Sequence, residues 1–147
     1  MSYKDFTDMP VWQRALEIGE DVFILTANLP KCEDYGLTSQ LRRASVSISA
    51  NIAEGFGRSG SKDKAKFYDY SRGSAFETNS LLLYGNKVGY FIESEIDLII
   101  DKSKSVIHDL NKIKLVLNKQ LRLNGYVSED FEYYGLNASE PHSEPQP

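Results

Sequence analysis

The chain has almost no cysteine or histidine, and this excludes most metal and disulfide chemistry. Its 147 residues include one cysteine, Cys32, and two histidines, His108 and His142. One cysteine cannot form an internal disulfide, and these three side chains are too few for a zinc site. A di-iron carboxylate bundle requires Glu-x-x-His pairs, whereas Ser105 stands three residues before His108. We therefore expect no metal and no cofactor.

Long apolar runs and a signal peptide are also missing. No stretch approaches the roughly 20 apolar residues that cross a bilayer. The polar start, MSYKDFTDMP, lacks the charged-then-apolar layout of a signal peptide. We therefore expect a cytoplasmic protein with no membrane partner.

Positive charge is missing from the end of the chain. From Asn124 onward there are five acidic residues and no Lys or Arg, and the last residues are rich in Pro, Ser and Glu. We predict one helical domain over residues 1–124 and an acidic, mostly disordered tail over 125–147. A second interpretation remains open, in which the tail docks on apolar or basic surface of its own or another subunit. The tail residues that favour docking are Tyr126, Phe131, Tyr133, Tyr134 and Leu136.

Apolar residues recur at helical spacing in four segments. The spacing predicts helices near residues 9–29, 37–57, 61–90 and 94–123. Ser94 and Asp97 resemble a capping box at the start of the fourth helix. Connections of a few residues between long helices imply antiparallel neighbours. The predicted fold class is therefore all-α, an antiparallel up-down-up-down four-helix bundle.

The first predicted helix has a wider apolar face than one neighbour requires. Its core seam runs from Val11 to Leu29, and a second stripe of Trp12, Leu16 and Phe23 lies beside that seam. A lone bundle would leave this stripe partly exposed. We therefore predict that it forms an interface between subunits of a homo-oligomer.

Gly55, Gly57 and Gly60 match the G-x-G-x-x-G spacing of phosphate-binding loops. Such a loop follows a strand, whereas these glycines follow a predicted helix. A P-loop also needs lysine directly after its last glycine, and here Ser61 precedes Lys62. We therefore interpret the glycines as a helix end, a turn and a new helix start. No constellation of catalytic residues stands out elsewhere, so we expect no enzyme.

Three polar residues interrupt apolar helical segments. Asn51 and Glu54 lie in the second predicted helix and Glu77 in the third, where Arg42 or Arg43 can meet them. One interpretation places them on solvated faces. We favour the other, a buried polar network that fixes helix register, because small residues flank Asn51 and Glu54.

Basic residues concentrate in the middle of the chain, among the aromatic residues Phe67, Tyr68 and Tyr70. Clustered cations with aromatic neighbours are typical of surfaces that bind nucleic-acid phosphates and stack bases. An ordinary charged helix surface is the competing interpretation. The candidate nucleic-acid-binding residues are Arg42, Arg43, Arg58, Lys62, Lys64, Lys66 and Arg72.

The stretch LRRASVSISANIAEG, with VWQRA before it and VGY after it, closely resembles a bacterial family. Its members are small four-helix-bundle proteins first noticed as products of intervening sequences within 23S rRNA genes. The similarity runs from about residue 11 to about residue 121. Ser49 stands where the family usually has proline, and family members commonly end before the tail of this chain.

The resemblance implies a ring-shaped homopentamer. A related branch, the accessory proteins of diversity-generating retroelements, binds nucleic acid through a basic surface and has a reverse transcriptase as its partner. We therefore predict a non-enzymatic, oligomeric accessory protein that binds RNA or DNA. The alternative is a structural protein whose ring scaffolds a protein partner without nucleic acid.

Overall fold

The computed structural model describes residues 2–125 and contains four long helices. These are α1 (Pro10–Thr26), α2 (Leu37–Gly57), α3 (Ser61–Lys87) and α4 (Glu93–Leu123). Two short 3-10 helices, η1 (Phe6–Asp8) and η2 (Lys31–Glu33), precede α1 and α2. Residues 2–125 contain no strand, which confirms the predicted all-α class and helix number. The predicted tail lies outside the described residues, apart from Gly125.

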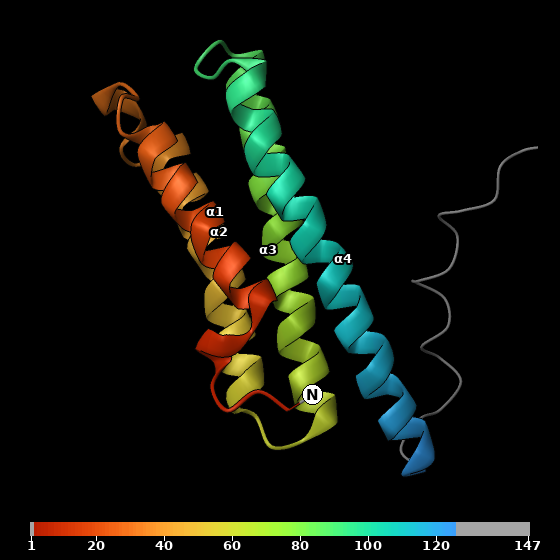
Figure 1. Ribbon diagram of the computed structural model, residues 1–147. Helices are drawn as coiled ribbons and strands as arrows, with labels where there is room; N and C mark the ends of the chain where they lie inside the picture. Colours follow the sequence, from red (N-terminus) through yellow and green to blue (C-terminus); the bar gives the residue numbers. More distant parts are fainter. Residues whose placement is uncertain (1, 126–147) are drawn as a thin grey trace, which may run out of the picture.

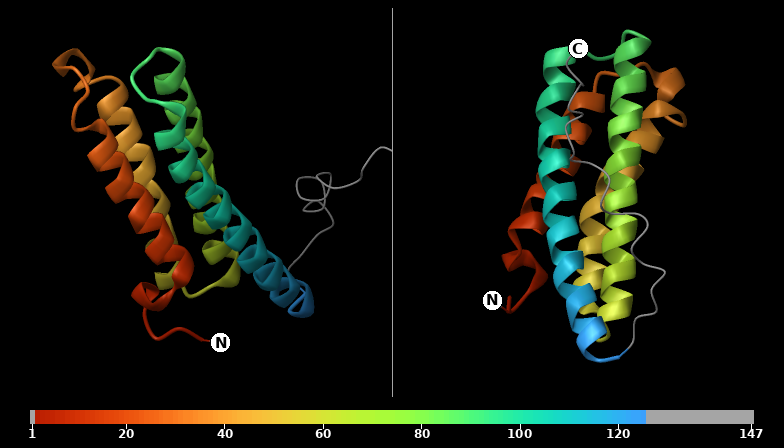
Figure 2. Two further views of the ribbon diagram at one scale, coloured as in Figure 1. Left: turned by 45° about the horizontal axis from the view of Figure 1, so that its top comes forward. Right: turned by 90° about the vertical axis from the view of Figure 1, so that its right-hand side faces the viewer.

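Each long helix packs against two others. The contacts join α1 to α2, α2 to α3, α3 to α4, and α4 back to α1. The α1–α2 and α3–α4 connections lie at one end of the molecule, which we call the upper end (Figures 1 and 2). The α2–α3 turn, the start of the chain and the end of α4 lie at the other, the lower end.

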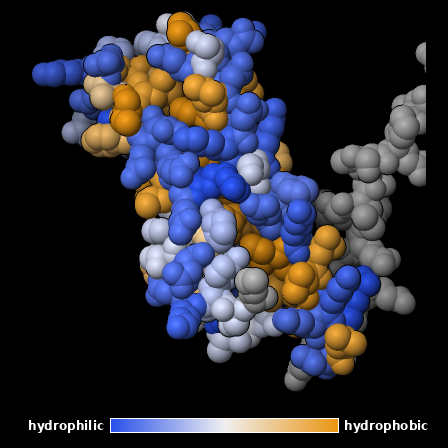
Figure 3. Space-filling model, viewed as in Figure 1, coloured by the Kyte–Doolittle hydropathy of each residue, from blue (hydrophilic) through white to orange (hydrophobic). Residues whose placement is uncertain are grey.

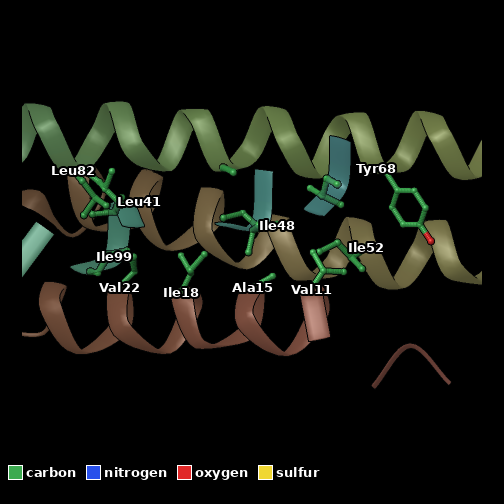
Figure 4. Close-up of a cluster of buried hydrophobic side chains, with 14 of the residues drawn as sticks. Val11, Ala15, Ile18, Val22, Leu41, Ile48, Ile52, Tyr68, Leu82 and Ile99 are labelled. Carbon is green, nitrogen blue, oxygen red and sulfur yellow. The ribbon is translucent and has the colours of Figure 1, made fainter. Parts of the chain in front are cut away.

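The core lies among the four helices and follows the predicted apolar spacing. Val11, Ala15, Ile18 and Val22 are buried on one side of α1. They face a second row of buried side chains that includes Ile48 (Figure 4). Steps of three and four residues place all four α1 side chains on one helix face, which explains why the seam is buried along its length.

Small residues bring the helices close together. Ser71 of α3 is fully buried, and its hydroxyl donates a hydrogen bond of 2.7 Å to the carbonyl of Ile48 in α2. Gly55 of α2 lies against the ring of Tyr68, which a Cβ atom at residue 55 would approach to 2.8 Å. The predicted run of small side chains in α2 therefore serves close helix packing.

Glu33 joins the two connections at the upper end. Its carboxylate accepts hydrogen bonds from the backbone N–H of Leu37, at 3.0 Å, and from the hydroxyl of Tyr90, at 2.9 Å. These two bonds lower the pKa of Glu33, the Leu37 bond more strongly, and the same carboxylate raises the pKa of Tyr90. One side chain thus satisfies a free amide at the start of α2 and contacts the α3–α4 connection.

Ion pairs join α1 to α4. Arg14 pairs with Asp109 at 2.8 Å, while Lys102 pairs with Asp21 at 2.6 Å and with Glu17 at 3.6 Å. Arg14, which comes earlier in α1 than Asp21, pairs with Asp109, which comes later in α4 than Lys102. These partly exposed pairs follow the register of the two helices along the outside of the core, and each contributes little to stability by itself.

Candidate nucleic-acid interface

The α2–α3 turn places a group of cations and aromatic rings at the lower end. The second helix ends at Gly57 and α3 begins at Ser61, so the glycine pattern spans the last turn of one helix and the short turn before the next, as predicted. Gly60 is the residue before α3, and no side chain caps the start of that helix. The amides of the first turn of α3 therefore have no side-chain partner at the cap position.

Five residues form what we call the basic–aromatic cluster: Arg58, Lys62, Lys66, Phe67 and Tyr70. The guanidinium carbon of Arg58 lies 4.5 Å from the centroid of the Phe67 ring. The Phe67 ring meets Tyr70 edge-on at 5.5 Å between centroids. The ammonium nitrogen of Lys66 lies 5.9 Å from the Tyr70 ring, and Tyr70 is 49% exposed. The cluster thus offers solvent both positive charge and an aromatic surface.

Helical spacing keeps these groups on one side of α3. Lys62, Lys66 and Tyr70 follow one another at four-residue intervals, so they lie on one face of the helix, and all three are exposed. Arg58 also pairs with Glu54 at 2.6 Å. Both side chains of that pair are close to half exposed, so water screens their interaction.

Two of the seven predicted cations instead stabilise the ends of helices. The ammonium group of Lys64 donates to the carbonyls of Phe56, at 2.6 Å, and Gly55, at 3.4 Å, in the last turn of α2. Arg42 donates to the Thr26 hydroxyl at 2.8 Å and to the carbonyl of Phe23 at 3.3 Å, near the end of α1. Positive charge at a helix C-terminus satisfies free carbonyls and the helix dipole.

The remaining two predicted cations lie apart from the cluster. Arg43 is exposed on α2, fifteen residues before Arg58, which corresponds to about 22 Å along a helix. Arg72 is half-buried on α3, and its guanidinium carbon lies 5.7 Å from the Phe76 ring. The structure therefore gathers three of the seven predicted cations, Arg58, Lys62 and Lys66, into one exposed group.

Sequence reasoning missed the cations of α4. Its last turns also reach the lower end, where the Ser61 hydroxyl lies 3.5 Å from the Gln120 side-chain oxygen. Between residues 111 and 125 there is no acidic residue, a signal that was readable from the sequence. Lys114 forms an ion pair with Asp69 of α3. The basic residues of this stretch are Lys112, Lys114, Lys119 and Arg122.

The predicted polar network does not form within the chain. Asn51 donates to the carbonyl and the hydroxyl of Ser47, one turn earlier in its own helix. Glu54 pairs with Arg58, and Glu77 is exposed on α3. The prediction of a buried network is therefore wrong. Local partners on α2 and access to water already satisfy these groups, so burial together is not required.

The predicted subunit interface divides into two parts. Trp12 packs its ring against Phe6 of η1, at 5.0 Å between centroids. Leu16 and Phe23 instead line an open groove between α1 and α2, and Phe23 is 59% exposed. The full lining is Leu16, Gly19, Glu20, Phe23, Ile24, Val46 and Ser49. Within residues 2–125, the guanidinium carbon of Arg42 lies 4.3 Å from the centroid of the Phe23 ring, and the rest of this apolar surface is open.

Within residues 2–125, no three or more His, Cys, Asp or Glu side chains are placed to hold a metal ion. No helix in this part of the chain is long and apolar enough to span a membrane.

Comparison with known proteins identifies the family. No curated protein matches the chain. A crystal structure of a protein of unknown function from the S23 ribosomal protein family of Bacteroides thetaiotaomicron has a similar fold, with a TM-score of 0.64 and 20% identity. The match covers 71% of this chain and 97% of the other. The family model for 23S rRNA-intervening sequence proteins matches residues 7–112. Because that match spans most of the 147 residues, the chain belongs to the 23S rRNA-intervening sequence protein family.

Proposed function

We propose that this protein is a non-enzymatic, cytoplasmic accessory protein that binds RNA or DNA through the basic–aromatic cluster at its lower end. The proposal includes an antiparallel up-down-up-down bundle that assembles into a ring. A reverse transcriptase partner rests on the sequence resemblance alone and stays a prediction.

The basic–aromatic cluster is the observation that carries the proposal. Lys62, Lys66 and Tyr70 are exposed on one face of α3, and Arg58 stacks on the neighbouring Phe67. Exposed lysines attract phosphates, while a half-exposed tyrosine supplies a surface on which a base can stack. Neither contact depends on base identity. The expected binding is therefore sensitive to salt and tolerant of sequence.

The distribution of charge favours the same end of the molecule. The upper end carries a surplus of acids, with Glu33 and Asp34 before α2 and Glu93, Glu95 and Asp97 at the start of α4. A polyanion is repelled there and attracted to the lower end. The overall negative charge of the chain is therefore compatible with binding at one end.

Two distinct apolar surfaces support assembly into a ring. The first is the α1–α2 groove, in which Ile24 is 70% exposed. The second lies on α3, where Phe76, Leu83 and Tyr84 are each about half exposed and share one helix face. Two different surfaces that meet head to tail generate a ring when the rotation between subunits closes, whereas one self-complementary surface generates a dimer.

Retention on immobilised RNA and DNA across a salt series tests the proposal. Changing Arg58, Lys62 and Lys66 together to Gln removes three cations, and we expect the slope of log affinity against log salt to fall by about 2 to 3. The matched control changes Lys31, Lys87 and Lys104 to Gln, which removes the same charge elsewhere. Equal loss in both variants, or no salt-sensitive retention by the wild type, would refute nucleic-acid binding at the cluster.

The second candidate function is a ring that scaffolds a protein partner, and the open α1–α2 groove favours it. Ile24→Glu places a charge on that groove without touching the core, since the side chain is 70% exposed. We expect the variant to keep its helicity and to lose oligomer mass by light scattering. A wild-type monomer at micromolar concentration would contradict both the ring and the scaffold.

A further inference from the structure

The last turns of α4 expose a helix face that no part of residues 2–125 covers. Leu115, Val116 and Leu123 are 60%, 57% and 86% exposed. With Lys112 and Lys119 they repeat at three- and four-residue steps, so all five lie on one side of the helix, opposite buried Leu117. We call this surface the α4 terminal face. Figure 3 shows apolar surface over the lower part of α4.

The α4 terminal face carries positive charge and no acidic residue, and Asp109, one turn before Lys112, is already in an ion pair with α1. Within the described residues, neither Lys112 nor Lys119 forms a hydrogen bond or an ion pair, although Lys102 and Lys114 of the same helix both have acidic partners. A surface of exposed leucine and valine between free lysines matches an occupant that combines acidic and apolar side chains.

The segment that follows α4 has this chemistry. Residues 126–136 read YVSEDFEYYGL, with three acids, four aromatic rings and no Lys or Arg. The acids Glu129 and Asp130 directly precede Phe131, and Glu132 directly follows it. Acidic and apolar side chains therefore alternate within a few positions, which matches the mixture of basic and apolar side chains on the α4 terminal face.

The end of α4 allows the chain to return along the same helix. Gly125 has a φ of 73°, the left-handed conformation that ends helices and redirects the chain. Lys112 lies thirteen residues before Gly125, about 20 Å along the helix. The eleven residues 126–136 span up to about 36 Å when extended, so they reach the whole face.

We infer that residues 126–136 dock on the α4 terminal face of their own chain, with aromatic side chains on Leu115 and Val116 and acids beside Lys112 and Lys119. The family match ends at residue 112, where this face begins. Apart from Lys112, the face and its occupant thus lie beyond the matched region. This inference does not depend on nucleic-acid binding.

Methyl NMR of the full chain, labelled at Leu and Val, tests the contact. Aromatic rings shift the signals of methyl groups that they contact. Replacing Phe131, Tyr133 and Tyr134 together by Ser should therefore move the signals of Leu115 and Val116. The signals of Leu16 and Val46, which are also exposed but lie on the α1–α2 groove, should not move.

A charge-reversal series tests the ionic part of the same contact. Changing Lys112 and Lys119 to Glu should release the segment and expose it to protease. Replacing Glu129, Asp130 and Glu132 by Lys in that background should restore protection. The matched control combines Lys31→Glu with Lys104→Glu. It changes the net charge by the same amount and should leave protection from protease unchanged.

Two results would overturn the inference. In the first, the serine variant leaves the Leu115 and Val116 signals where they are. In the second, these signals respond to protein dilution and not to the tail substitutions, which would assign the face to a second copy of the chain.

Discussion

Gly85 of α3 is the position where adding one methyl group should be most damaging. A Cβ atom there would lie 2.3 Å and 2.4 Å from two ring carbons of Phe91, far inside the roughly 3.5 Å of normal carbon contact. Phe91 is 4% exposed, and its carbonyl accepts a hydrogen bond of 2.9 Å from Asn86. Neither the ring nor its backbone can move away freely.

The magnitude follows from two opposing terms. Alanine is intrinsically better than glycine inside a helix by about 1 kcal/mol. Forcing the Phe91 ring aside costs about 2 to 4 kcal/mol, between ordinary overpacking and loss of a buried phenylalanine. Gly85→Ala should therefore lower the free energy of unfolding by about 1 to 3 kcal/mol.

Urea unfolding followed by circular dichroism, at one fixed protein concentration, measures this change. Gly73→Ala is the matched control, because a Cβ atom at residue 73 meets nothing within 4 Å. That control should stabilise the protein by about 0.5 to 1 kcal/mol. In a Phe91→Ala background the two ring contacts disappear, and the contact that remains, 3.3 Å to the end of the Leu37 side chain, needs a shift of only a few tenths of an ångström, so Gly85→Ala should there become stabilising as well. The same sign for Gly85→Ala in both backgrounds would refute the reasoning.

Three further predictions concern single side chains. Arg42→Met should destabilise the protein by about 1.5 to 3 kcal/mol through the lost hydrogen bonds to the end of α1, without weakening RNA retention. Ser71→Val should destabilise it by about 1 to 3 kcal/mol in urea unfolding, because it adds bulk and leaves the Ile48 carbonyl without its hydroxyl donor. The hydrogen bond with Asp21 raises the pKa of Lys102 in the folded protein. The stability that Lys102 contributes is therefore complete below the unfolded pKa of about 10.4, and it is lost as pH rises through the higher pKa of the folded state. Lys102→Met should therefore flatten the alkaline part of a stability-versus-pH curve.

Helix number and helix class were predictable because the apolar spacing is regular. The second helix begins and ends where predicted, at Leu37 and Gly57. The ends of the other helices depend on contacts that spacing does not reveal. The first helix ends at Thr26, three residues early, where Arg42 from α2 binds its last turn. The fourth helix begins at Glu93, one residue earlier than predicted. The side chain that caps its start is Glu95, which accepts from the backbone N–H of Ile92, and the predicted capping box of Ser94 and Asp97 is not used.

The candidate site was predictable only in part, because sequence proximity does not distinguish a free cation from one bound to a helix end. Lys62, Lys64 and Lys66 alternate along the chain, yet Lys64 faces the last carbonyls of α2 while the other two are exposed. Each residue is rotated by 100° from the one before it, so Lys64 points in a different direction from Lys62 and Lys66. Which of these directions faces α2 depends on how α3 packs against α2. The run of cations in α4 was readable from the sequence, but its place beside the α2–α3 turn follows from the packing of α4 against α3.

The two proposals meet at the lower end, where the Ser61 hydroxyl lies 3.5 Å from Gln120 of α4. A docked acidic segment beside Lys119 therefore lies near the start of α3 and lowers the positive potential that attracts phosphates to the basic–aromatic cluster. Coupling between two ligands of one surface is reciprocal. Changing Glu129, Asp130 and Glu132 to Gln should strengthen RNA retention at low salt, and adding RNA to the wild type should move the Leu115 and Val116 methyl signals as the serine variant does. If RNA binds at the cluster and leaves those signals unchanged, the segment and the nucleic acid occupy independent surfaces.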